Sequence, residues 1–377
     1  MLRTACIRLN LTPEQGERLS TLRRAYAEAC NRLVPLVQKE RCWNRVALHH
    51  LGYRRLRQET SLGAQMACNA IFSVCKAYRS QRALGRLAAD TAVPALCFNR
   101  ASVHFDHRTY TLKGETVSLN TLQGRMLVPT ILGDHQREIL QRGRPKEAEL
   151  VFRRGGWFFN LVVESDDAET VASGPVMGVD VGENTLAAAS TGRIWGGEAL
   201  RHRRDQHLAL RRRLQSNGSQ SARQTLGQVS GRERRRVRHI NHETSKGIVA
   251  EARRIGAAKI VMEDLTHIRE RIRAGRRVRT RLHRWAFRQL QSFVEYKARA
   301  VGITVEYVNP AYTSQTCSAC KQLGTRRKHR FECSCGFRAH ADLNSSWNLA
   351  WIGATAVTPR AAVNTPDVGC VARHASP

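Results

Sequence analysis

Two apolar stretches, VMGVDVG at residues 176–182 and KIVMEDL at residues 259–265, decide the fold predicted for this chain. Each is typical of a buried strand, and each carries a carboxylate at its end, Asp180 in the first and Glu263 in the second. A buried carboxylate without a partner is costly. Taken singly, each acid is better explained as a loop cap or as the partner of an arginine. Because strands of α/β sheets present functional groups at their carboxyl ends, we expect the pair to share one site.

A third acid, Asp342, lies in HADLNSSWNLA at residues 340–350, which has the pattern of the first turns of a helix. A negative charge at a helix N-terminus alone would stabilise the helix by under about 1 kcal/mol. Clustered carboxylates, however, bind hard cations such as Mg²⁺ or Mn²⁺, which remove their mutual repulsion. Two ions about 4 Å apart would activate water and stabilise the leaving oxygen of a phosphodiester. We therefore predict metal-dependent hydrolysis with Asp180, Glu263 and Asp342 as catalytic and metal-binding residues.

Four of the eleven cysteines have the spacing of zinc ligands: Cys317, Cys320, Cys333 and Cys335. They form a C-x-x-C pair and a C-x-C pair, separated by a short basic stretch. Four thiolates fill a closed tetrahedral site, so we predict structural Zn²⁺ that holds Asp342 and its helix in place. A redox role for the first pair is the alternative, and His329 or His340 could replace one ligand.

The chain is strongly basic, with 62 Lys and Arg against 31 Asp and Glu, a formal net charge of +31 and an isoelectric point near 11.0. Charge of this size attracts polyanions over a long range, so nucleic acid is the expected partner. A genome that prefers arginine codons would explain Arg in place of Lys, but not the twofold excess of basic residues. A membrane-surface protein can also be basic, but we find no lipidation signal and no isolated amphipathic anchor.

Two segments concentrate the arginines. Residues 201–238 have few acids to neutralise them, so we interpret this segment as a phosphate track rather than a solvated helix face. Residues 268–284 are similarly basic and interrupted by glycine, and we predict a mobile lid there. Runs of arginine do not distinguish RNA from DNA. The arginines expected to contact nucleic acid are Arg211, Arg212, Arg213, Arg234, Arg235, Arg236, Arg276 and Arg277.

The apolar pattern divides the chain into three regions. A short alternating strand precedes TPEQ at residues 12–15, a helix-start signal with a capping residue and a proline, and helical spacing then continues to about residue 87. From about residue 93 to 164, short β-branched and aromatic runs predict a small barrel, to which the first strand could add. A polar stretch marks a boundary near residue 170, and the rest is one α/β unit. No apolar run of about 20 residues appears, so we expect an intracellular protein.

These motifs, in this order, resemble the TnpB family, the insertion-sequence-encoded ancestors of the miniature type V CRISPR nucleases. The resemblance covers roughly residues 177–352. It departs from the family at His340, because the family often has an acid two residues before its last catalytic aspartate. The motifs that carry the resemblance are GVDVG at 178–182, VMEDL at 261–265, YTSQTCSAC at 312–320 and CSCG at 333–336, leading into Asp342 and Asn344.

The resemblance implies an α/β RNase H-like (RuvC) nuclease domain with an inserted zinc finger. A small wedge β-barrel that carries an inserted helical bundle, the recognition lobe, precedes it. The implied function is that of an RNA-guided DNA endonuclease, which binds a guide RNA from its own mobile element and cleaves DNA next to a short adjacent motif. The implied partners are guide RNA and double- and single-stranded DNA. We expect a monomer or homodimer, associated with the nucleoid in a prokaryotic cytoplasm.

The family layout also sets the expected domain bounds, and it leaves two other functions open. A nuclease-inactive, RNA-guided repressor is disfavoured because all three acids are present. An unguided RNase H-like transposase or recombinase uses the same metals, and only the motif order speaks against it. The expected bounds are 1–11 for the first wedge strand, 12–90 for the recognition lobe, 91–170 for the rest of the wedge, 171–312 for the first part of the nuclease with a basic helical excursion at 201–256, 313–338 for the zinc finger, 339–353 for the last nuclease helix, and 354–377 for a loosely ordered tail.

Overall fold

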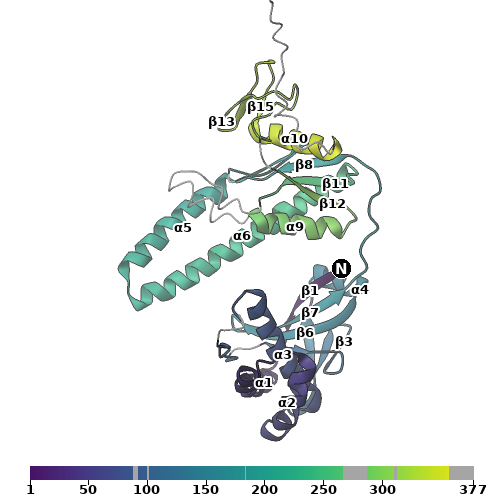
Figure 1. Ribbon diagram of the computed structural model, residues 1–377, viewed down its shortest axis with the longest axis vertical. Coiled ribbons are helices and arrows are strands. Elements are labelled where there is room, and N and C mark those ends of the chain that lie inside the picture. Colours follow the sequence, from purple (N-terminus) through teal and green to yellow (C-terminus); the bar gives the residue numbers. More distant parts are fainter. Residues whose placement is uncertain (88–91, 100–101, 183, 266–286, 310–311, 356–377) are drawn as a thin grey trace, which may run out of the picture. The chain divides into compact units, whose positions relative to one another are not determined.

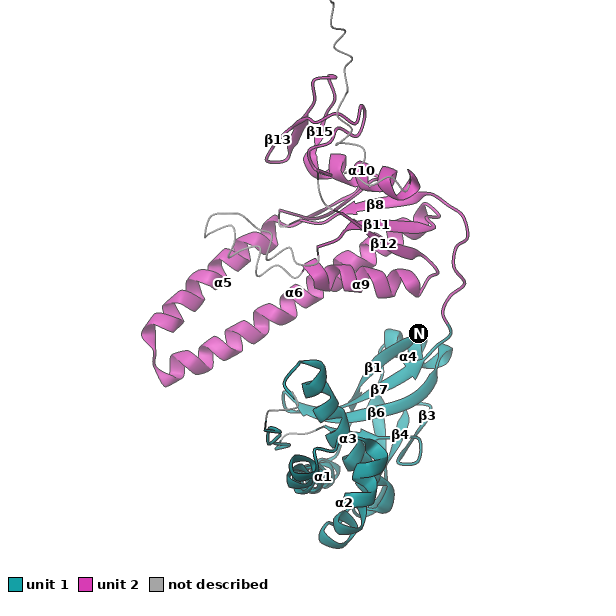
Figure 2. Cartoon of the chain, viewed as in Figure 1, with its two compact units in different colours: residues 1–166 teal, residues 167–377 magenta. Residues whose placement is uncertain are grey.

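The computed structural model describes residues 1–355, apart from residues 88–91, 100–101, 183, 266–286 and 310–311. Two compact units make up the chain, Met1–Asp166 and Asp167–Pro377 (Figure 2). The expected lid, together with Arg276 and Arg277, lies outside the described residues, as does the tail from residue 356. No helix among the described residues is both long and apolar enough to cross a membrane.

Unit 1 combines a seven-stranded antiparallel sheet, in the order β2-β6-β7-β1-β5-β4-β3, with helices that follow its first strand (Figure 1). The predicted pairing of the first strand with the later strands is present, because β1 lies between β7 and β5. Its elements are β1 (Leu2–Leu9), α1 (Pro13–Glu40), α2 (Arg45–Glu59), α3 (Ala64–Ala83), β2 (Val103–Phe105), β3 (Tyr110–Lys113), β4 (Thr116–Thr121), β5 (Gly124–Ile131), α4 (Asp134–Arg142), β6 (Arg144–Arg153) and β7 (Gly156–Glu164).

Helix α1 begins where the sequence predicts. The Thr12 hydroxyl accepts a hydrogen bond from the Gln15 backbone N–H at 3.2 Å, and the Gln15 side chain accepts one from the Thr12 backbone N–H at 3.1 Å. Pro13 occupies the first helical position, where its missing N–H costs nothing. Gly52 of α2 lies against this helix, because a Cβ there would come within 2.6 Å of the Leu33 side chain. The glycine therefore lets the two helices pack closely.

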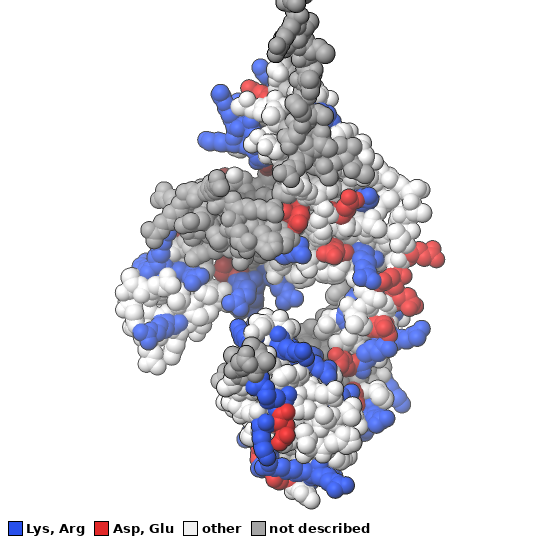
Figure 3. Space-filling view, viewed as in Figure 1, with Lys and Arg blue, Asp and Glu red and all other residues white. Residues whose placement is uncertain are grey.

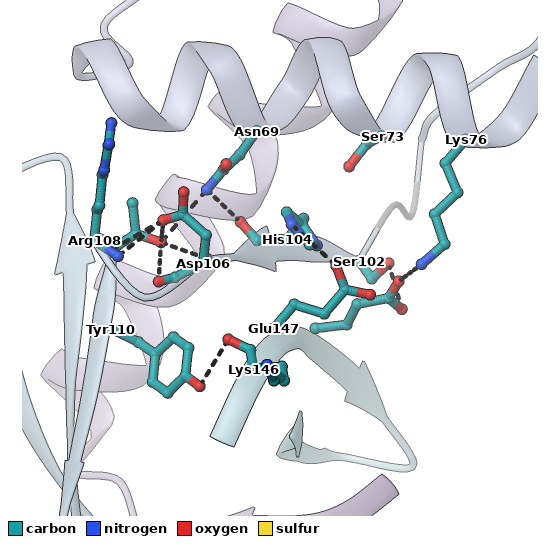
Figure 4. A network of polar contacts seen from close by, with 12 residues as sticks. Asn69, Ser73, Lys76, Ser102, His104, Asp106, Arg108, Tyr110, Lys146 and Glu147 are labelled. Carbon is teal, nitrogen blue, oxygen red and sulfur yellow. Dashed lines mark hydrogen bonds and ion pairs between the residues drawn. The ribbon is translucent and has the colours of Figure 1, made fainter. Parts of the chain in front are cut away.

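A polar network fastens α3 to the sheet (Figure 4). The buried Asn69 side chain donates to the His104 carbonyl at 3.2 Å and to the Thr109 hydroxyl at 3.4 Å. Farther along the helix, the Lys76 ammonium lies 3.1 Å from the Glu149 carboxylate on β6. Burial lowers the pKa of His104, because a cation is poorly solvated at this position. These contacts join residues far apart in the sequence, so they hold the inserted helices on the barrel.

Unit 2 is built on a five-stranded sheet, in the order β10-β9-β8-β11-β12. Strands β8, β11 and β12 run parallel, and β9 and β10 are antiparallel. Figure 1 shows α10 on one face of this sheet and α6 and α9 on the other. The elements are β8 (Val176–Asp180), β9 (Thr185–Ala189), β10 (Ile194–Gly196), α5 (Glu198–Asn217), α6 (Gln220–Arg254), β11 (Lys259–Glu263), α9 (Phe287–Arg299), β12 (Thr304–Val308), β13 (Thr325–Arg327), β14 (Arg330–Glu332), β15 (Arg338–His340) and α10 (Ala341–Thr355).

Candidate active site

Asp180 and Glu263 are the last residues of two neighbouring parallel strands. In the pairing of β8 with β11, Val179 lies opposite Met262, so the two acids follow at the same edge of the sheet. Strand β8 is flanked by β9 and β11, and only 9% of Asp180 is exposed. The sheet therefore brings two of the predicted site residues together, and it holds one of them largely away from water.

Helix α10 carries Asp342 in its first turn and lies directly on the sheet. Two glycines allow this close approach. A Cβ on Gly178 would come within 2.0 Å of the Ser346 carbonyl oxygen, and a Cβ on Gly353 would come within 2.2 Å of the Val261 side chain. Any larger side chain at either position would push the helix away from the strands. The position of the third predicted acid therefore depends on the close packing of α10 against the strands at Gly178 and Gly353.

The three carboxylates act on one another. Burial raises the pKa of Asp180 well above its ordinary value, and the charges of Glu263 and Asp342 raise it further. Burial likewise raises the pKa of Glu263, although a hydrogen bond from the Thr313 hydroxyl opposes this effect. A divalent cation would remove this repulsion, and an all-oxygen donor set is what Mg²⁺ and Mn²⁺ prefer. The residues present therefore fit such an ion.

One positive charge is already close to this cluster. The Arg326 guanidinium lies 2.7 Å from Asp342 Oδ1, and its charge counteracts the rise in the pKa values of Asp180 and Glu263. Arg326 belongs to β13, within the segment between the two cysteine pairs. Sequence reasoning missed this residue because it lies in a run of similar basic residues, TRRKHR at 325–330. The contact links the cysteine segment directly to the candidate active site.

The sulfur atoms of Cys317, Cys320, Cys333 and Cys335 all lie within 4.8 Å of one another. The distance from Cys317 Sγ to Cys335 Sγ is 3.8 Å, and that from Cys320 Sγ to Cys333 Sγ is 3.5 Å. Zn–S bonds of about 2.3 Å in a tetrahedron place the sulfurs about 3.8 Å apart, so the group fits zinc. His329 and His340 are not members of this close group.

Two buried asparagines on α10 hold the loop that leads into the cysteines. Asn344 donates to the Thr316 carbonyl at 2.7 Å and accepts a hydrogen bond from the Ser318 backbone N–H at 2.9 Å. One turn later, Asn348 donates to the carbonyls of Thr313 and Thr316, at 3.0 and 2.6 Å. The helix of the third acid and the cysteine loop are therefore one unit. The sequence signal that could have revealed this is the pair of asparagines four residues apart, which lie on the same face of the helix.

The C-terminal part of the chain matches known proteins. Residues 287–349 match the family model described as Cas12f1-like, TNB domain. Over 137 residues, the chain is 39% identical to a TnpB-like protein of Methanocaldococcus jannaschii, a match that covers 36% of this chain and 49% of that protein. Over this C-terminal part, the chain is similar to TnpB-like proteins and to the Cas12f1-like family model.

Two further similarities are to Cas12 proteins. It is 40% identical over 114 residues to the CRISPR-associated endodeoxyribonuclease Cas12f1 of Sulfoacidibacillus thermotolerans, covering 29% of this chain and 26% of that protein. Its fold resembles that of Cas12f1 in a solved complex with sgRNA and target DNA, with a TM-score of 0.58, 15% identity, and coverage of 90% and 83% of the two chains. The matched segments span about half or less of the length of these curated relatives.

The long α5–α6 hairpin carries the described arginines that were predicted to contact nucleic acid (Figure 3, blue). The chain reverses at Gly218, whose φ of 68° is costly for other residues. Between the helices, Glu233 is largely buried and lies 3.7 Å from the Arg204 guanidinium. Other arginines face solvent: the exposed side chains are Arg212, Arg213, Arg234, Arg235 and Arg236, whereas Arg211 is half-buried. The Arg236 guanidinium lies 3.6 Å from the Glu233 carboxylate, and the other four exposed arginines have no ion pair among the described residues, so they form an unneutralised basic surface.

Proposed function

We propose that this chain is an RNA-guided DNA endonuclease, which binds a guide RNA from its own mobile element and hydrolyses DNA next to a short adjacent motif. The observation that carries the proposal is that Asp180 and Glu263 end neighbouring parallel strands, and that Asp342 of α10 is close enough for its charge to raise the pKa of Asp180. We assign unit 2 to a RuvC/RNase H-like nuclease domain, and unit 1 to a wedge barrel with an inserted recognition lobe. The named relatives support both assignments.

In this proposal, the three carboxylates would hold Mg²⁺ or Mn²⁺, and the four cysteines would hold Zn²⁺. Such catalytic ions supply an activated water and a positive charge for the leaving oxygen of a phosphodiester. The chain itself fixes the ligands. The Thr313 hydroxyl orients the Glu263 carboxylate, and the buried Gln291 side chain donates to the Glu263 carbonyl at 2.6 Å. These contacts leave the glutamate little freedom to turn away from the site.

Arg326 has a second role in the proposal. Its guanidinium lies 2.7 Å from Asp342, so it limits the repulsion within the cluster. From this position beside the acids, the guanidinium would also be able to pair with the phosphate of a bound DNA strand.

The proposed partners are guide RNA and target DNA. The exposed arginines of the α5–α6 hairpin provide the positive charge that a polyanion requires. Among the relatives, the Cas12f1 structure is a complex with sgRNA and target DNA, and we extend those ligand classes to this chain. Base pairing would read the DNA sequence, while the protein would bind backbone shape and the adjacent motif.

The proposal is tested by expressing the protein together with the DNA that naturally flanks its gene. RNA that co-purifies is sequenced, and the complex is mixed with Mg²⁺ and with plasmids that carry matching targets beside randomised flanks. We expect one abundant RNA and cleavage of matched plasmids with a shared flanking motif. Guided binding without cleavage would indicate a repressor, and cleavage without RNA would indicate an unguided transposase or recombinase. Either result would refute the proposed function.

A further inference from the structure

The β6–β7 hairpin of unit 1 places aromatic rings and arginines together at its tip. Phe152 and Trp157 lie opposite each other in the pairing of the two strands, with their ring centroids 5.1 Å apart. Trp157 is buried at the rim of the barrel core, whereas 42% of Phe152 is exposed. The hairpin therefore exposes the Phe152 ring to solvent, and the buried Trp157 ring packs behind it.

Arginines accompany these rings on both faces of the hairpin. The Arg23 guanidinium, from α1, lies over Phe152 at 5.4 Å and over Trp157 at 5.5 Å from the ring centroids. On the other face, the Arg153 guanidinium lies over the Phe158 ring at 4.4 Å. Stacked guanidinium groups of this kind keep their hydrogen-bond donors free at the edge of the plane. The surface can therefore offer both stacking and anion contacts.

The turn between the strands is fixed by its backbone conformation. Arg154 has a φ of 51° and Gly155 a φ of 73°, the pattern of a tight two-residue hairpin turn. Arg154 is a non-glycine residue in this region, and its side chain is exposed at the very tip. The rigid turn means that the aromatic and basic groups are arranged before any ligand arrives, which lowers the entropy cost of binding.

The positive charges at the hairpin are not neutralised by carboxylates among the described residues. Among the residues that the structure describes, Arg23, Arg153 and Arg154 form no ion pair with a carboxylate. Arg153 instead donates to the Cys6 sulfur at 2.7 Å. An exposed aromatic ring surrounded by unpaired arginines is unfavourable for packing against an ordinary apolar protein surface, but it matches unpaired bases joined by phosphates.

We propose that the hairpin platform, formed by Phe152, Arg153, Arg154, Trp157 and Phe158 of β6–β7 with Arg23 of α1, stacks an unpaired base of the guide RNA. The inference rests on the proposed function. In that function the target strand pairs with the guide, whereas loops of a folded RNA keep their bases available. Phe152 would provide the exposed face for the base, and Arg153 and Arg154 would contact the flanking phosphates.

The first test is ultraviolet cross-linking of the RNA-loaded, full-length protein, treated with DNase and then digested for mass spectrometry. We expect a nucleotide adduct on the peptide that contains Phe152 before any DNA is added. An adduct on this peptide that forms only with target DNA would overturn the assignment to guide RNA. A protein that carries no RNA would instead contradict the proposed function itself.

The second test measures the affinity of the full-length protein for a fluorescent single-stranded RNA oligonucleotide, in EDTA so that cleavage plays no part. Replacing Phe152 by alanine should weaken binding about tenfold, the loss expected for one stacked base. Phe152→Tyr should retain the wild-type affinity because it keeps the ring. Leu127→Ala removes a residue that is 67% exposed on β5 and should have no effect. Equal binding by Phe152→Ala and the wild type would overturn the inference.

Discussion

At the scale of single residues, the candidate active site is a cluster of three acids and one arginine, Arg326, whose charges act on one another. Asp180 and Glu263 stand out because each ends an apolar strand, where a carboxylate needs an explanation. The contact of Arg326 with Asp342 could not be predicted, because the adjacent Arg327 and Lys328 have the same chemistry. Only the positions of β13 and α10 in the folded chain determine that Arg326, and not one of its basic neighbours, contacts Asp342.

His242 of α6 provides a residue-scale prediction on stability and pH. Its ring stacks on Phe293 of α9 with the centroids 3.9 Å apart, and burial, assisted by the nearby Lys297 charge, lowers the pKa of His242 to about 4. An unfolded histidine has a pKa near 6.5. Between these two values the unfolded state binds more protons than the native state, so this group's contribution to stability is complete above about pH 6.5 and is lost as the pH falls towards 4.

The measurement compares wild type with His242→Phe, which keeps an aromatic ring but cannot take up a proton. We expect the stability of the wild type, relative to the variant, to decrease as the pH is lowered from about 7 to about 5 in urea denaturation. A difference between the two proteins that stays constant over this range would show that the pKa of His242 is not lowered in the fold.

At the scale of elements, the sequence predicted where several helices and strands begin, but not how they pack against one another. The capping box places the start of α1 locally, because it needs only four consecutive residues. The packing of α10 on β8 depends instead on the close contact of Gly178 with Ser346, and these two residues are 168 positions apart in the sequence. The loop contacts of Asn344 and Asn348 are equally long-range, so no local pattern specifies them.

Gly178→Ala tests the seating of α10. Its Cβ would come within 2.0 Å of the Ser346 carbonyl oxygen, so the helix must move, and we expect a loss of about 3 kcal/mol in the free energy of unfolding. Gly227→Ala is the matched control, because Gly227 lies inside α6 with no atom within 4 Å of an added Cβ. The control should gain up to about 1 kcal/mol. Equal stability of the two variants in urea denaturation would refute this packing of α10 on the sheet.

The cysteine cluster gives a second prediction at this scale. Cys317→Ser or Cys335→Ser should release zinc and lower the melting temperature of the C-terminal unit, because the remaining ligands cannot close the site. Zinc content is measured by mass spectrometry and stability by calorimetry. Cys97→Ser, at an exposed cysteine of unit 1, is the control and should change neither quantity. Full thermal stability of the Cys317 variant would exclude a structural zinc role.

At the scale of the whole molecule, the net charge of +31 predicts that binding of nucleic acid, the proposed partner, depends on salt. Affinity should fall steeply with salt, and each phosphate contact that is lost should reduce the slope of log K against log salt by about 0.7 to 0.9. We expect this reduction for Arg212→Gln and Arg235→Gln, two exposed arginines of the α5–α6 hairpin. An unchanged slope in both variants would exclude this hairpin as a phosphate-binding surface.

Arg32→Gln is the matched control for charge. The Arg32 guanidinium already lies 2.7 Å from Glu28 and 2.9 Å from Glu59, so its charge is neutralised within the protein. Its replacement should therefore leave the slope unchanged. Total charge is readable from composition, but which arginines remain unpaired depends on the fold. The sequence alone therefore predicts that the protein attracts nucleic acid, and the structure is needed to identify the arginines that would contact it.

The measurement that tests the account most directly is cleavage of a matched plasmid by the RNA-loaded protein in Mg²⁺, comparing wild type with Asp180→Asn and Glu306→Gln. Asp180 lies in the carboxylate cluster, whereas Glu306 is a carboxylate of the same sheet, paired with Lys259 at 2.7 Å. We predict cleavage by wild type and by Glu306→Gln, and at least about a hundredfold slower cleavage by Asp180→Asn with RNA binding retained. Undiminished cleavage by Asp180→Asn would contradict the account.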